Sequence, residues 1–156
     1  MKQSRRHTLQ AAGGLGLYSA LVAAGLLPAG AAAAEEFNAQ AFTAKSIADA
    51  MKALGASAPA VSRDVSIISP DIAENGAVVP VGVKSAIPNT QFIALMVEKN
   101  PFALAAAYDI HQGAQAEVNM RVKMGQSSDV YALVRADGKF YMAKKEIKVT
   151  LGGCGG

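Results

Sequence analysis

Hydrophobic and polar residues alternate along much of the chain after residue 60, a pattern typical of β-strands with one buried face. The clearest example is residues 118–124, where valine and methionine alternate with Asn119, Arg121 and Lys123. Similar runs, separated by turn residues, occur at 65–67, 77–83, 102–110, 130–134, 140–142 and 147–151, and a further strand is indicated at 92–97 by a continuous apolar run. About seven short strands at regular spacing, with no helix between them, predict an all-β protein built as a β-sandwich.

Local features predict how some of these strands are placed. Residues 92–97 are apolar at every position and predict a central strand that is covered on both faces. Pro80 lacks the N–H that a central strand needs, and it therefore predicts an edge position or a bulge for its strand. Turns are predicted at Asn75-Gly76 and, closing a hairpin, at Asp137-Gly138.

One helix is predicted before the strands, over residues 39–54. Asn38 is a suitable N-cap for it, and Gly55 is a suitable end. One side of this segment carries large apolar residues at helical spacing: Phe42, Ile47, Met51 and Leu54. The sequence thus predicts a sandwich with one N-terminal helix.

The first 34 residues have the layout of an export signal. Arg5 and Arg6 form a twin-arginine pattern, a weakly apolar stretch follows at 9–27, and the alanine-rich run 29–34 offers cleavage sites. The apolar stretch is long enough to raise the alternative of a permanent membrane anchor, but glycines dilute it. We predict that residues 1–34 are a cleaved twin-arginine signal peptide, and that the mature protein is periplasmic with no stable membrane insertion.

Removal of the signal leaves a single domain of about 120 residues, long enough to bury its own core. We assign residues 35–151 to this domain. The formal net charge of +3 is due to basic residues of the signal. The mature chain is therefore near neutral, and it contains no tryptophan, so that nucleic-acid binding is not expected.

Cys154 is the only cysteine in the chain and carries the strongest chemical signal. It is surrounded by glycines, namely Gly152, Gly153, Gly155 and Gly156. Because glycine allows nearly any backbone conformation, residues 152–156 are expected to form a flexible arm. A thiolate is a strong nucleophile, and an unpaired thiol in an oxidising compartment indicates a reactive group or intermolecular chemistry. An extended tail carries the sulfur roughly 10 Å past the last strand, which suits delivery into a narrow channel.

The remaining residues predict no catalytic site, metal or cofactor. His111 is the only histidine outside the signal, and a metal site needs several converging ligands. No nucleophile motif of the G-x-S-x-G type is present. Four lysines lie near the tail in sequence and either attract an anion bound to Cys154 or form a solvated face: Lys139, Lys144, Lys145 and Lys148.

Three functions agree with these features. The first is a covalent carrier that presents a group on Cys154 to other proteins. The second is a structural periplasmic β-sandwich that forms an intermolecular disulfide through Cys154. The third is a hydrolase whose activity does not need Cys154. Only the first explains why glycine surrounds the thiol on both sides.

Four segments resemble those of the SoxY family, the sulfur carriers of the periplasmic thiosulfate-oxidising Sox system. The ending at residues 149–156, Val-Thr-Leu-Gly-Gly-Cys-Gly-Gly, is similar to the hallmark ending of that family. Residues 74–81, 100–106 and 121–128 also resemble family patterns, and the likeness extends over the predicted mature domain.

The resemblance implies an immunoglobulin-like sandwich that forms a heterodimer with a SoxZ-type subunit. It also implies transient encounters with the SoxAX cytochrome, the SoxB hydrolase and, where present, the SoxCD sulfane dehydrogenase. In this family the cytochrome joins thiosulfate to the carrier cysteine as a cysteine S-thiosulfonate, and the hydrolase releases sulfate. The position that matches the carrier cysteine is Cys154. The resemblance further implies that the carrier holds its substrate covalently, has no catalytic role and binds no cofactor.

Overall fold

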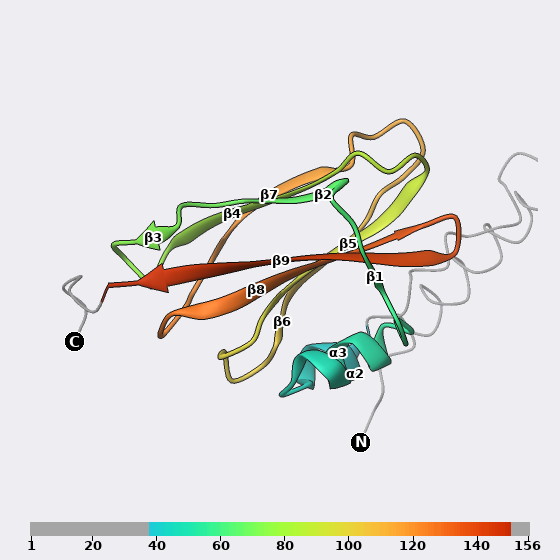
Figure 1. The fold of residues 1–156 in the computed structure, drawn as a ribbon. Helices are drawn as coiled ribbons and strands as arrows, with labels where there is room; N and C mark the ends of the chain where they lie inside the picture. The colour runs from blue at the N-terminus through green and yellow to red at the C-terminus, as the bar shows by residue number, and fades with distance from the viewer. Residues whose placement is uncertain (1–37, 151–156) are drawn as a thin grey trace, which may run out of the picture. The chain divides into compact units, whose positions relative to one another are not determined.

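The computed structural model describes residues 38–150 (Figure 1). The predicted signal peptide at residues 1–34 and the predicted arm at residues 152–156 lie outside this part of the chain. The helices are α2 (Ala39–Thr43) and α3 (Ile47–Ala53). The strands are β1 (Ala60–Val61), β2 (Val65–Ile68), β3 (Ile72–Ala73), β4 (Val79–Ser85), β5 (Thr90–Val97), β6 (Leu104–Asp109), β7 (Glu117–Val122), β8 (Ser128–Ala136) and β9 (Lys139–Val149). None of the helices in this part of the chain has the length and apolar character needed to span a bilayer.

The strands form two sheets that pack face to face. The larger sheet has the order β1-β9-β8-β5-β6, with β3 also paired to β9, and the smaller sheet has the order β2-β4-β7. All neighbours are antiparallel except β1 and β3, which run parallel to β9. The predicted immunoglobulin-like β-sandwich is confirmed. Each predicted strand is present, and residues 140–142 and 147–149 belong to the same strand, β9. The two-residue strands β1 and β3 are not among the predicted strands.

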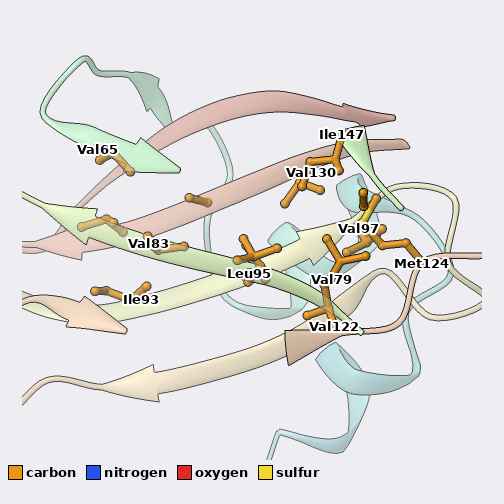
Figure 2. Close-up of a cluster of buried hydrophobic side chains, with 14 residues drawn as sticks. Val65, Val79, Val83, Ile93, Leu95, Val97, Val122, Met124, Val130 and Ile147 are labelled. Carbon is orange, nitrogen blue, oxygen red and sulfur yellow. The ribbon is translucent and has the colours of Figure 1, made fainter. Parts of the chain in front are cut away.

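The space between the sheets is filled by the side chains that the alternating pattern marks as apolar. Figure 2 shows valines of β4 facing β5 and β8 across this core. Ile93, Leu95 and Val97 of β5 belong to it and are fully buried. The residues between them, such as Ala94 and Met96, point to the opposite face and pack with the helices. Strand β5 is therefore covered on both sides, and the prediction of a central strand at residues 92–97 is confirmed.

The N-terminal segment forms two short helices, so the prediction of one continuous helix over residues 39–54 is wrong. Ala44 leaves the helical conformation, and its carbonyl accepts a hydrogen bond of 2.8 Å from the N–H of Ala103, the residue before β6. Ser46 then begins α3 as a new N-cap, since its hydroxyl accepts from the N–H of Asp49. A tertiary contact thus outweighs local helix propensity at this point.

Asn38 joins the two helices. Its Oδ1 accepts from the N–H of Ala41 at 3.0 Å, and its Nδ2 donates to the carbonyl of Ala53 at 2.9 Å. We expect Asn38→Ala to lower the free energy of unfolding by about 1–2 kcal/mol, because it removes an N-cap and a second hydrogen bond. Urea denaturation checks this, with Gln40→Ala on the exposed side of α2 as a control that leaves the stability nearly unchanged. Equal stability of the two variants would contradict the prediction.

Strand β4 occupies the middle of the smaller sheet, so the edge or bulge predicted from Pro80 is wrong. Strand β2 pairs with β4 only over residues 82–85. Pro80 lies beyond this stretch and faces Arg121 of β7. The missing N–H of Pro80 is therefore tolerated, because donors on both sides of β4 are needed only further along the strand.

Candidate functional site: the end of the last strand

The proposed carrier residue Cys154 and its flanking glycines lie outside the described residues. The structure follows the chain to Thr150, which is exposed and stands four residues before Cys154. The geometry of the site is therefore that of the end of β9, from which the cysteine-bearing segment leaves.

Strand β3 pairs with one edge of β9 near the end of that strand. Figure 1 shows β3 next to the arrowhead of β9, and the two strands run parallel. The N–H of Lys148 donates to the carbonyl of Asp71 at 2.9 Å, and the N–H of Thr150 donates to that of Ala73 at 3.1 Å. Lys145 fixes the approach to β3, since its Nζ donates to the carbonyl of Ser69 at 2.6 Å and pairs with Asp71 at 2.9 Å.

A serine side chain holds the other side. The last pair of the β8–β9 ladder is Ser128 with Ile147. Beyond it, the hydroxyl of Ser127 accepts a hydrogen bond of 2.9 Å from the N–H of Val149. The ladder is thus extended past the end of β8, and consecutive N–H groups of β9 are bonded alternately to the two sides up to Thr150.

Gly76 lies in close contact with the backbone of Met124 and with the side chain of Val149. The N–H of Met124 donates to the carbonyl of Gly76 at 2.7 Å. A Cβ at Gly76 would collide with the carbonyl oxygen of Met124 and would lie 2.8 Å from Cγ1 of Val149. Only glycine fits between these two groups. The turn that precedes it is confirmed, because Oδ1 of Asn75 accepts from the N–H of Ala77 at 2.9 Å.

The three internal segments that resemble the SoxY family meet at this end of the sandwich. Residues 74–81 contact residues 121–128 through the bond between Gly76 and Met124. Residues 100–106 reach the same segment, since Nδ2 of Asn100 donates to the carbonyl of Lys123 at 2.9 Å. Segments far apart in the sequence therefore converge on the strand that leads to Cys154.

The four lysines singled out in the sequence do not form a group of unpaired charges at the end of β9. Lys139 starts β9 and lies at the opposite end of this strand from Thr150. Lys145 is neutralised by Asp71, and Lys144 pairs with Asp129 at 2.9 Å. The hydrogen bond to Asp129, helped by the charge of that carboxylate, raises the pKa of Lys144. A joint attraction of these lysines for an anion on Cys154 is therefore not supported.

His111 is exposed just after β6. Within residues 38–150, no group of three or more His, Cys, Asp or Glu residues is arranged to hold a metal ion. The residues that sequence reasoning missed are Asp71, Ala73 and Ser127. Their only sequence signal is that Ser127 lies in a segment that resembles the family pattern, since their contacts with β9 span many residues.

A β-sandwich whose last strand is held to its end, and which continues into the only cysteine of the chain, has the architecture of a covalent carrier protein. The model of the family described as sulfur oxidation protein SoxY matches residues 50–154. The chain belongs to this family, and it acts as a sulfur carrier in sulfur oxidation.

Solved structures agree with this assignment. The sulfur carrier protein SoxY from Chlorobium limicola f thiosulfatophilum is 36% identical, with a TM-score of 0.61, over 66% of this chain and 94% of that chain. A superoxide reductase (neelaredoxin) from Ignicoccus hospitalis is 23% identical, with a TM-score of 0.50, over 55% of this chain and 79% of that chain. The second likeness shows a shared fold alone. No protein with a curated functional description matches the chain.

Proposed function

We propose that Cys154 is the point at which sulfur intermediates of thiosulfate oxidation are covalently attached. The observation that carries this proposal is the position of the only cysteine, four residues after the firmly held Thr150. An extended segment of four residues spans about 14 Å, so the thiol can enter a pocket that the sandwich itself cannot enter. The flanking glycines present no side chains to the walls of such a pocket.

The loading step forms a sulfur–sulfur bond between the Cys154 thiolate and the outer sulfur of thiosulfate. The two sulfur atoms together lose two electrons, which the haems of a c-type cytochrome of the SoxAX type accept one at a time. Water then cleaves the bond between the sulfane sulfur and the sulfonate group, which leaves sulfate and a persulfide on Cys154. A SoxB-type hydrolase catalyses this cleavage, and a SoxCD-type dehydrogenase, where present, oxidises the remaining sulfur.

In this scheme the chain has no catalytic residue of its own and no cofactor. Its partners supply the redox and hydrolytic chemistry, and a SoxZ-type subunit forms a heterodimer with it. Each visit to a partner orders a glycine-rich tail at a cost of about 1–2 kcal/mol per residue. Binding is therefore weak and transient, as a carrier that serves several enzymes requires. Copurification of a tagged chain from its own organism tests the heterodimer.

The carrier works in the periplasm after export by the twin-arginine pathway. The pattern at Arg5 and Arg6 and the alanine-rich run before Glu35 support this location. Cell fractionation and N-terminal sequencing are expected to find the mature protein in the periplasmic fraction, beginning at Glu35. A chain that stays in the cytoplasm with residues 1–34 attached would contradict the proposal.

Intact mass spectrometry of the mature protein, with its thiol unblocked, tests the attachment site. Incubation with thiosulfate and the oxidised cytochrome is expected to give a reducible adduct on the peptide that contains Cys154. A thiol that stays unmodified, or a symmetric disulfide dimer as the sole product, would overturn the attachment and favour the structural alternative.

A further inference from the structure

Hydrogen bonds hold the end of β9 beyond the last residue that pairs with β8. The paired residues end at Ile147, yet the N–H groups of the next three residues all have acceptors. For Val149 the acceptor is a side chain, the hydroxyl of Ser127. We propose that Ser127 is a positioning residue that fixes Thr150 as the pivot of the carrier arm.

Ser127 is suited to this role because its hydroxyl bonds to the backbone edge of β9 opposite to the edge that pairs with β3. The bonds to Asp71 and Ala73 hold Lys148 and Thr150 on one side only. Without the hydroxyl, the N–H of Val149 has no acceptor on the other side. The backbone bonds that still oppose separation of the last residues from the sandwich are then those to the approach to β3 and to β3 itself, a strand of two residues. Where they separate, the sequence distance between the last held residue and Cys154 increases from four residues to six or more.

The number of residues between the last held residue and the thiol matters for a carrier. The effective concentration of a tethered group falls roughly as the −3/2 power of the tether length. Additional freed residues must also be ordered again whenever the arm enters a partner. A fixed pivot therefore favours productive encounters with partner enzymes, while the intrinsic reactivity of the thiol does not depend on it. This inference rests on the proposed attachment at Cys154.

The test compares Ser127→Ala with two matched variants. Ser127→Thr keeps a hydroxyl at the same position. Ser128→Ala removes a neighbouring hydroxyl that accepts from the N–H of Lys99 at 3.0 Å, outside β9. Amide hydrogen exchange is measured at Val149 in the full mature chain. It is expected to accelerate roughly fivefold or more in Ser127→Ala, the factor that loss of one hydrogen bond gives. Ser127→Thr and Ser128→Ala are expected to retain the slow exchange.

Kinetics with the loading cytochrome give a second readout. With thiosulfate saturating and the carrier as the varied substrate, Ser127→Ala is expected to raise KM roughly two- to fivefold with kcat unchanged. Ser127→Thr restores the original KM. The rate of alkylation of Cys154 by iodoacetamide stays the same in all variants, because a small reagent needs no fixed pivot.

Unchanged exchange at Val149 in Ser127→Ala would overturn the inference, and so would an equal acceleration in Ser128→Ala. An unchanged KM despite faster exchange would reduce Ser127 to a structural role and overturn its positioning role. Failure of the proposed function looks different. In that case the wild-type chain takes up no sulfur at Cys154, whereas the exchange measurement needs no sulfur chemistry and still decides whether Ser127 holds the end of β9.

Discussion

Replacing Cys154 by serine is expected to abolish sulfur loading completely. The proposed intermediate needs a sulfur–sulfur bond, and a hydroxyl oxygen can neither form this bond nor ionise appreciably at neutral pH. The chain contains no other cysteine that could take over. Intact mass spectrometry after incubation with thiosulfate and the oxidised cytochrome is expected to show no adduct for Cys154→Ser and an adduct for the wild type.

Two controls separate loss of the thiol from other causes. The melting temperature of Cys154→Ser is expected to equal that of the wild type, because the substitution is nearly isosteric and lies outside the described sandwich. A second variant adds Ser66→Cys to Cys154→Ser and so places a thiol on an exposed position of β2. It is expected to remain unloaded, because an immobile thiol on the sandwich surface cannot enter a pocket. Loading of either variant would contradict a specific role of Cys154.

The strands that the sequence predicts correctly are those with at least one face in the core. Alternation at residues 118–124 and 130–134 reflects burial between the sheets, which is a local and repeated requirement. The two missed strands lack such a requirement. Strand β3 has only two residues, and Ile72 is 55% exposed in it. It is a strand because it bonds to β9, more than seventy residues away in the sequence.

The two wrong predictions share the same physical cause. The helix was predicted to be continuous because nothing in residues 39–54 shows that Ala44 binds the backbone of Ala103. The edge position was predicted from Pro80 because the sequence does not show where β2 ends along β4. In both cases a partner distant in the sequence decides the local structure, and propensity alone does not identify that partner.

The candidate site also contains one residue that the sequence identifies and several that it does not. Cys154 is recognisable from chemistry, as a single thiol among glycines near the end of the chain. The residues that support its exit strand are not recognisable in this way. Ser127 reaches Val149 across 22 positions, and Ala73 reaches Thr150 across 77. The sequence therefore predicts which atom reacts, while the structure shows what holds the end of the strand that precedes it.

Gly76→Ala tests whether the contact of Gly76 with Met124 and Val149 supports the end of β9. It is expected to destabilise the fold by about 1–3 kcal/mol, the usual cost of overpacking. The added Cβ would collide with a backbone oxygen, that of Met124, and would press on Val149 at 2.8 Å. Backbone cannot rotate away as a flexible side chain can, so the loop must shift. For a domain of this size the melting temperature is expected to fall by roughly 5–15 °C.

Gly125→Ala is the matched control, since a Cβ at Gly125 meets nothing within 4 Å and lies on the same segment as Met124. Its melting temperature is expected to stay within roughly 2 °C of the wild type or to rise slightly, because alanine restricts the unfolded chain.

Amide exchange at Val149 distinguishes a local effect of Gly76→Ala from a general loss of stability. If Gly76 supports the end of β9, Gly76→Ala accelerates this exchange more than it accelerates exchange at Leu95 in the core. Equal melting temperatures for the two alanine variants would show that the loop yields without cost, and Gly76 would then have no special role below Val149.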